Sequence, residues 1–388
     1  MPRRQLIALF VCSLSMWTVA QGLLALLPVY ATRLGADPGL TGGYLAIAFA
    51  GITLGTVATG WLSDRFQRRK LVLVIVAVVN GVATWLMGFA SAFWQLVILT
   101  TVVWFFFGVG LTLISILAGM FAGESERGKI FGILATNTSL GALIGGVVSG
   151  PIADQLGYPT LFLIAGLCWA TVPLSVLFLQ DRTTPLTGRA AVPQPVKESA
   201  LGINFNLLIA ATTIGFGASF AAVLGRPLVM NQAGFNQADI SGAVAMGGLV
   251  SLPFPFLVGW LSDRVGRYGL VALCFLISAA GLLMLAFAVQ LWHYWIATIL
   301  LSGVGVSLAI GPALVTDLVP SKVLGTALAR YGAAPPVGAV IGFLSTGYAI
   351  EAFGMMPTLI GAALLTVGAV ALLFQVRRRQ GSLTTAGA

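Results

Sequence analysis

The sequence predicts an all-α polytopic membrane protein, with twelve transmembrane helices arranged in two pseudo-symmetric six-helix bundles. The first observation is composition: of 388 residues, 58% are hydrophobic and only 8% are charged, and the mean hydropathy is +1.00. A soluble chain of this length cannot bury so much apolar surface. The second observation is a series of apolar runs of spanning length, and the third is an internal repeat that relates the two halves of the chain.

The apolar runs are counted against the length of about 20 residues that a spanning helix needs. The first run is too long for the core of a signal peptide, so we interpret it as a helix. The predicted spans are residues 6–30, 41–62, 71–90, 93–121, 129–152, 158–179, 205–230, 238–261, 270–290, 292–318, 325–350 and 357–376.

One long polar segment divides the chain. Residues 180–204 carry five charged side chains and three prolines between the sixth and seventh spans. We therefore predict an N-terminal bundle at residues 1–180, a cytoplasmic linker at 181–203 and a C-terminal bundle at 204–388.

The basic residues predict the orientation. With the N-terminus inside, 17 of the 20 Lys and Arg residues are cytoplasmic, whereas only Arg33 and Arg226 are outside and Arg330 lies within a span. Cytoplasmic loops of multi-pass proteins carry such an excess. The net charge of +9 is thus explained by topology and not by nucleic-acid binding. We expect a plasma (inner) membrane protein with both termini cytoplasmic.

The internal repeat is clearest in the sequence GWLSDR, which occurs at residues 60–65 and again at 259–264, 199 positions later. Pro28 and Pro227 are also 199 apart. Glycines of the fifth and eleventh spans match at an offset of 197, at residues 128, 141, 145, 150 and 157 and residues 325, 338, 342, 347 and 354. Two halves with the same pattern indicate two copies of one bundle.

The charged segment that contains GWLSDR follows the pattern G-x-L-x-D-R-x-G-R-(R/K), which resembles the loop between helices 2 and 3 of the major facilitator superfamily of secondary transporters. In that family the pattern recurs between helices 8 and 9. The first copy has Gln67 where the family has Gly, and the second copy has Gly266. The resemblance implies a substrate site near the bilayer midplane, between the two bundles.

The resemblance also implies a gate. In the family the motif carboxylate latches the outward-facing state against the positive N-terminal end of a helix from the other half. The alternative is a solvated basic loop that only fixes topology. The predicted gating residues are Gly60, Asp64, Arg65, Arg69, Gly259, Asp263, Arg264 and Arg267.

Helices 1, 4, 7 and 10 line the cavity in this fold, together with part of helix 5. Their polar and aromatic residues predict a largely neutral, aromatic pocket. Two cations leave alternatives open: Arg226 either extends to the outer interface or binds an anionic substrate, and Arg330 either pairs with Asp317 or Asp64 or binds substrate. The predicted cavity residues are Trp17, Gln21, Trp104, Phe107, Asn137, Thr138, Phe216, Phe220, Arg226, Ser302 and Arg330.

Small residues recur every four positions in the fifth span, at Gly141, Gly145 and Ser149. Their placement resembles the antiporter motif of drug-exporting members, although Gly146 stands where that motif has Pro. The alternative is close helix packing alone.

Proton coupling usually needs a carboxylate within the membrane. Neither residues 6–30 nor residues 93–121 contain an acid or a base. Asp317, at the inner end of the tenth span, is the candidate that remains, and the alternative is a carrier that protons do not drive.

No enzyme chemistry is visible: the sequence has no P-loop, no nucleophile elbow and no metal-ligand cluster, and we expect no cofactor. We expect a monomeric secondary transporter that exports a small amphipathic organic molecule by alternating access, with the proton as candidate coupling ion. One alternative is an uptake carrier or facilitator for an organic anion that uses Arg226 or Arg330. Another is a non-transporting sensor or a lipid scramblase.

Overall fold

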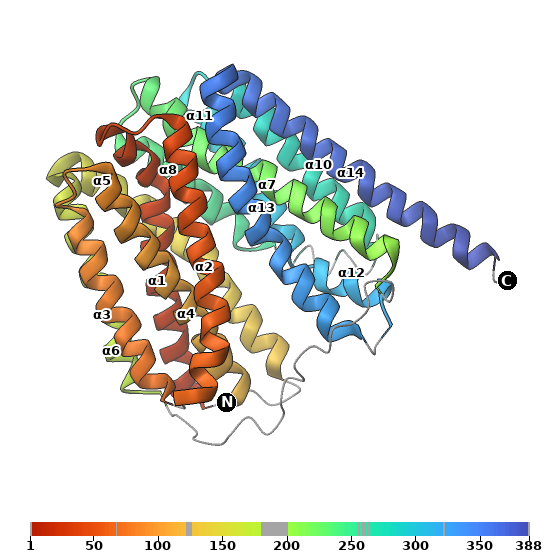
Figure 1. Ribbon diagram of the computed structural model, residues 1–388, viewed down its shortest axis with the longest axis horizontal. Coiled ribbons are helices and arrows are strands. Elements are labelled where there is room, and N and C mark those ends of the chain that lie inside the picture. The colour runs from red at the N-terminus through yellow and green to blue at the C-terminus, as the bar shows by residue number, and fades with distance from the viewer. Residues whose placement is uncertain are drawn as a thin grey trace. The chain divides into compact units, whose positions relative to one another are not determined.

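The structure, a computed structural model, describes residues 2–66, 68–121, 126–179, 201–254, 257, 261, 264, 266–320 and 323–386, without the side chains of residues 60–66, 127–128 and 380–386. Every regular element in these ranges is a helix (Figure 1). Ten helical stretches within them are long and apolar enough to cross a membrane.

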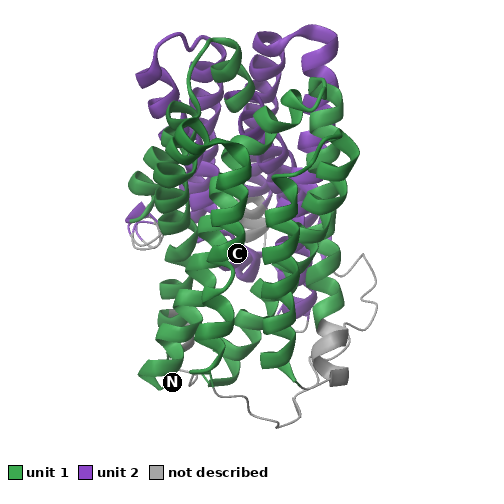
Figure 2. Ribbon diagram, turned by 90° about the vertical axis from the view of Figure 1, so that its left-hand side faces the viewer, with its two compact units in different colours: residues 1–187, 227–252 green, residues 188–226, 253–388 purple. Residues whose placement is uncertain are grey.

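The helices form two compact units (Figure 2). The first unit comprises residues 1–187 and 227–252, and the second comprises residues 188–226 and 253–388. Residues 227–252 belong with the first unit because α8 packs along α5. The first unit contains α1 (Arg3–Arg33), α2 (Pro38–Phe66), α3 (Arg69–Met87), α4 (Phe93–Phe121), α5 (Arg127–Cys168), α6 (Thr171–Val176) and α8 (Gln237–Ser251).

The second unit contains most of α7 (Gly202–Gln232), followed by α10 (Arg267–Ala286), α11 (Leu291–Ser307), α12 (Gly311–Leu318), α13 (Leu324–Phe353) and α14 (Met355–Ala386). Its core is a cluster of apolar side chains from α7, α10, α11, α12, α13 and α14, among them Phe205, Phe275 and Tyr331. The predicted division of the chain at residues 180–204 is based on the sequence repeat, whereas the two units are defined by packing. The predicted division remains a prediction.

The structure agrees with the predicted all-helical fold but places several helix ends differently. The predicted fifth and sixth spans form one helical stretch, Lys129–Val176, that bends at Gly157. The predicted tenth span is divided into α11 and α12. When the two parts of Lys129–Val176 are counted separately and α8 is added, the described helices are compatible with twelve spans.

The repeat is visible in backbone conformation. Gly157 has φ 81° and ψ 167°, and its counterpart Gly354 has φ 85° and ψ 171°. Gly35 and Gly234, 199 positions apart, have φ of 85° and 83°. Glycine adopts this left-handed region without steric cost, which explains why the residue type is kept at both copies of each turn.

The two copies also share a packing mode between their first and fifth helices. A Cβ added at Gly145 of α5 would overlap with the Thr18 carbonyl oxygen of α1. A Cβ added at Gly342 of α13 would overlap with the carbonyl oxygen of Gly217, the counterpart of Thr18 in α7. The close helix packing predicted from the glycine spacing is therefore confirmed, and small residues permit it because they let backbones touch.

We expect the substitution Gly342→Ala to destabilise the protein by about 1–3 kcal/mol, because the added methyl group forces α7 and α13 apart. Gly361→Ala on α14 is the matched control, since no atom lies within 4 Å of its added Cβ. Thermal unfolding of the purified variants in detergent measures both effects. Equal melting temperatures for the two variants would contradict this packing.

Candidate functional site

An aromatic cluster forms in the first unit from residues predicted to line the cavity. The Trp17 ring meets the Phe107 ring edge-on with centroids 5.2 Å apart, and Trp104 meets Phe107 in the same way at 5.3 Å. Phe49 of α2 extends the cluster, with its centroid 5.6 Å from that of Trp104. Trp104 and Phe107 are buried and Trp17 is partly buried. Three predicted cavity residues thus lie together on α1 and α4.

The polar residues predicted beside this cluster have different environments. Gln21 and Thr138 are partly buried. Asn137 is fully buried, and its Nδ2 donates to the Phe10 carbonyl oxygen at 3.2 Å. Asn137 therefore ties α5 to α1, while its Oδ1 has no hydrogen-bond partner among the described residues.

The cavity residues of the second unit are mostly engaged within it. Phe216 is buried in the core cluster, and the Phe220 ring packs against Phe343 with centroids 4.9 Å apart. The Ser302 hydroxyl donates to the Ile299 carbonyl oxygen of its own helix at 2.6 Å. These side chains serve the packing and hydrogen bonding of α7, α11 and α13.

Arg226 differs from the prediction that it extends to the interface, because only 8% of it is exposed. Its Nη1 donates to the Thr298 hydroxyl oxygen at 3.0 Å, whereas its Nε has no partner among the described residues. A buried guanidinium is costly unless it is paired, so this arrangement leaves a donor available. Arg330, by contrast, is exposed.

Asp317 has a partner that the sequence did not indicate. Arg267 Nη1 lies 2.8 Å from each carboxylate oxygen of Asp317 and also donates to the Ala313 carbonyl oxygen at 3.1 Å. The predicted pair of Asp317 with Arg330 is therefore wrong. Arg267 begins α10 and belongs to the second copy of the gating motif, so this ion pair joins the predicted gate to the predicted coupling residue.

The structure describes the gating motif only in part. Only the backbone is described at Gly60, Asp64 and Arg65, and Gly259 and Asp263 lie outside the described residues. Among the rest, Arg69 is buried at the start of α3 and Arg264 is exposed. The latch formed by Asp64 and Asp263 remains a prediction.

A second gate candidate is the α5–α8 seam, defined by contacts of residues 139–158 with residues 237–251. The Asp154 carboxylate accepts hydrogen bonds from the backbone N–H of Gln237 at 3.0 Å and of Ala238 at 2.8 Å. The Tyr158 hydroxyl donates to Gln237 Oε1 at 2.9 Å. A carboxylate from α5 thus caps the N-terminus of α8.

Glycines bring the two helices of the seam together. A Cβ at Gly146 would lie 2.5 Å from the Ala245 nitrogen, and one at Gly248 would lie 2.6 Å from the Leu143 nitrogen. The Gly150 N–H donates to the Ser241 hydroxyl oxygen at 3.0 Å. Gly146 and Gly150 are four residues apart, like Gly141 and Gly145, and they directly follow Gly145 and Ser149 of that first series. This second series of small residues is the sequence signal that indicates a second partner helix.

Comparison with known proteins adds the family. Residues 6–269 and 207–387 match the Major Facilitator Superfamily. The chain belongs to this superfamily. It is accordingly a multi-pass membrane transporter of small molecules and not an enzyme.

Relatives of this superfamily member include the Multidrug resistance protein MdtG of Serratia proteamaculans, 27% identical over 311 residues that cover 76% of this chain and 73% of the relative. The protein of the same name from Proteus mirabilis is 26% identical over 344 residues, 84% of each chain.

Solved structures agree on the fold. A bacterial homologue of the human lysosomal transporter Spinster, in an inward-facing and unoccupied conformation, matches with a TM-score of 0.79 and 13% identity over 97% of this chain and 98% of its own. A mutant of the nucleoside transporter NupG matches with a TM-score of 0.78 and 13% identity over 96% of this chain and 99% of its own. At this identity the likeness shows the fold alone.

We expect Thr298→Val to destabilise this transporter by about 1–3 kcal/mol, because it removes an acceptor from the buried Arg226 guanidinium. Thr366→Val is the matched control: Thr366 is also buried, and its hydroxyl donates only to the Ala362 carbonyl oxygen of its own helix. Thermal unfolding measures both. An equal loss of stability in both variants would mean that the Thr298 hydroxyl does not stabilise the Arg226 guanidinium.

Proposed function

We propose that the protein exports small amphipathic organic molecules across the plasma membrane by alternating access. The observation that carries this proposal is the neutral aromatic cluster of Trp17, Trp104 and Phe107. It lies on α1 and α4, and α4 contains no charged residue. Flat aromatic rings without fixed charge bind many apolar and aromatic molecules and select weakly among them. The names of the relatives, multidrug resistance proteins, support the same substrate class.

The proposal includes a topology and a state of assembly. The distribution of Lys and Arg supports cytoplasmic termini, so that α1 and the part of α5 before Gly157 run outward and α8 runs inward. Asp154, three residues before the bend of α5 at Gly157, is then on the outer side together with the start of α8. We propose that the transporter works as a monomer.

The α5–α8 seam supports a role as the outer gate. Gln237 and Ala238 donate to Asp154, and the bend of α5 and the start of α8 have to separate if the cavity is to open outward. Opening then replaces the carboxylate by water at two backbone N–H groups. The cost of such a loss at a helix N-terminus is small enough for a transport cycle.

We expect Asp154→Asn to shift the resting population toward an open outer side by several-fold, because a lost helix cap is worth about 0.5–2 kcal/mol. Spin labels at Leu156 and Ala233, both exposed, report the separation of α5 from the start of α8 by pulsed electron resonance. The native cysteines are replaced first.

The matched control is Asp239→Asn, which removes a charge from the first turn of α8 itself without touching the contact to α5. The population with longer distances should grow in Asp154→Asn and stay as in the wild type in Asp239→Asn. Identical distance distributions in all three proteins would exclude the seam as a gate.

A second candidate function is uptake of an organic anion, favoured by Arg226 with its unused buried Nε. A carboxylate or phosphate group of a substrate is the natural partner for such a donor. Arg330 is less suited to this role, since it is exposed.

Transport by proteoliposomes distinguishes the two functions. With an imposed pH gradient, we expect the protein to transport ethidium, an amphipathic aromatic cation, and not to transport carboxyfluorescein, an anion. Arg226→Gln should leave ethidium transport largely intact. Transport of the anion alone, lost in Arg226→Gln, would instead establish the uptake function.

The coupling proposal concerns Asp317. Protons can drive the cycle only if some group changes charge between the two states. We propose that Asp317 pairs with Arg267 in one state and takes up a proton in the other, when the pair has separated. We expect Asp317→Asn to abolish dependence on the pH gradient while energy-independent exchange of ethidium persists, with Glu351→Gln, another exposed acid, as control. A variant that keeps proton-driven accumulation would remove Asp317 from the mechanism. Wild-type transport that ignores the gradient would indicate a facilitator or a sodium-coupled carrier.

A further inference from the structure

A groove with one charged residue lies between α1 and α6 on the first unit, and its volume is about 610 Å³. Its apolar lining consists of Ile7, Ala8, Val11, Leu174 and Phe178. All of these except Ala8 are at least 37% exposed, so they face lipid in a membrane. The polar lining is Ser175, whose hydroxyl donates to the Thr171 carbonyl oxygen of its own helix, and Arg4, which is exposed. Arg4 is therefore the group that a polar part of an occupant would meet.

The charged residue stands at one end of the groove, and the apolar lining continues from it into the membrane. Arg4 is the second residue of α1, and Val11 lies about 10 Å further along this helix at 1.5 Å per residue. The whole helix has 31 residues and is about 46 Å long. It exceeds a hydrocarbon core about 30 Å thick, which places its first turn among the lipid headgroups.

The first turn of α1 concentrates positive charge. Arg3 and Arg4 begin the helix, its first turn contains no acidic residue, and no side chain caps it. Neither arginine forms an ion pair with another residue that the structure describes. The N-terminal end of a helix is itself positive, so two cations there are unfavourable and an anion beside them is stabilising. The chain thus leaves a positive charge at the headgroup level without a compensating group.

We propose that this groove binds an anionic phospholipid, with the phosphate beside Arg4 and an acyl chain along the apolar lining. A cation at the headgroup level and an uncharged channel below it match the two parts of such a lipid. Basic pockets between membrane helices on the cytoplasmic side bind anionic headgroups in this way. The site goes beyond the export function. It rests on the proposed topology only where the lipid is assigned to the cytoplasmic leaflet.

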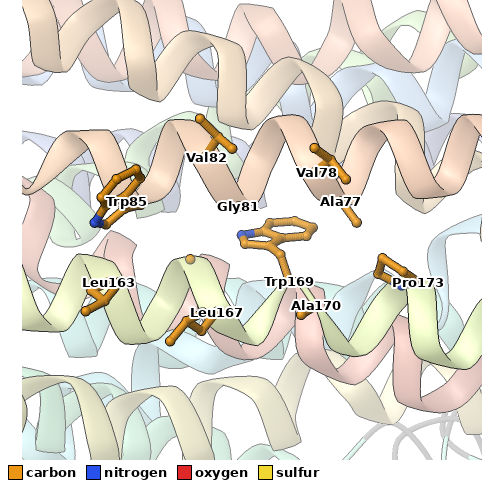
Figure 3. A pocket seen from close by; sticks show the side chains of 11 residues that line it. Ala77, Val78, Gly81, Val82, Trp85, Leu163, Leu167, Trp169, Ala170 and Pro173 are labelled. Carbon is orange, nitrogen blue, oxygen red and sulfur yellow. The ribbon is translucent and has the colours of Figure 1, made fainter.

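An uncharged groove on the same unit provides an internal comparison. It lies between α3 and the stretch from α5 to α6, with a volume of about 450 Å³ (Figure 3). Val78, Val82 and Leu167 in its lining are exposed, and none of its lining residues is charged. A lipid held by its acyl chain alone will occupy both grooves without regard to headgroup, whereas a lipid recognised by its negative charge will favour the groove with Arg4.

Photoreactive lipids test the proposal without transport and in either orientation of the protein, since both leaflets of a nanodisc have the same composition. The full-length transporter is placed in phosphatidylcholine nanodiscs with a trace of a lipid that carries a diazirine on one acyl chain. This lipid is either phosphatidylglycerol, which is anionic, or phosphatidylcholine, which has no net charge. Labelled peptides are identified by mass spectrometry after irradiation.

The readout is the ratio of phosphatidylglycerol to phosphatidylcholine labelling in each segment. We expect this ratio to be about fivefold higher in residues 4–11 and 174–178 than in residues 78–82 and 163–167, the preference that one basic residue near the surface provides. Arg4→Gln should lower the ratio to that of the uncharged groove, while Arg4→Lys, which keeps the charge, should retain most of it. Melting temperatures of the variants are measured alongside.

The matched control is Arg3→Gln, because Arg3 is exposed and carries the same charge but does not line the groove. The ratio should stay close to that of the wild type. An equal fall in Arg3→Gln and Arg4→Gln would mean that the basic N-terminus attracts anionic lipids without a site. Equal ratios in the two grooves of the wild type would mean that acyl chains alone occupy them. Either result would overturn the proposal.

Discussion

Backbone contact between helices is the interaction on which this structure depends. Within a bilayer, apolar side chains gain little by leaving lipid for protein, so helices associate through close packing and hydrogen bonds. In α5 this contact is made twice. Gly145 touches α1 at Thr18, while Gly146 touches α8 at Ala245. One helix thereby holds two partners on adjacent faces, and both the aromatic cluster and the α5–α8 seam are positioned by it.

In the α5–α8 seam, glycines permit the two helices to approach closely, and hydrogen bonds then stabilise the contact. The first N–H groups of a helix have no partner within the helix. In α8, Asn236 accepts from the Asp239 N–H, and Asp154 of α5 accepts from those of Gln237 and Ala238. One N–H group at the start of α8 is thus bonded by the residue that precedes the helix, and two others are bonded by α5. That division makes the contact specific without making it permanent, because water can take the place of the carboxylate.

The sequence was sufficient for the fold, since composition, span length and a repeat with matched turns leave few alternatives. It was less informative about the site. Hydropathy places a residue along a helix but does not fix the rotation of that helix about its axis. This is why a pair of Arg330 with Asp317 stood among the alternatives for Arg330, and why Arg226 was not expected to be buried against Thr298. Trp17, Trp104 and Phe107 lie together because α1 and α4 are neighbours, while their role in lining a cavity remains a prediction, and Asp154 was recognised only as the repeat of Glu351.

The ion pair of Arg267 with Asp317 has a genetic consequence. One side chain belongs to the motif that the family uses for gating, and the other is the candidate for energy coupling, yet they share one contact. Mutations selected for altered gating and mutations selected for altered energetics would then fall on the same two codons. Second-site suppressors of a change at one position would be found at the other.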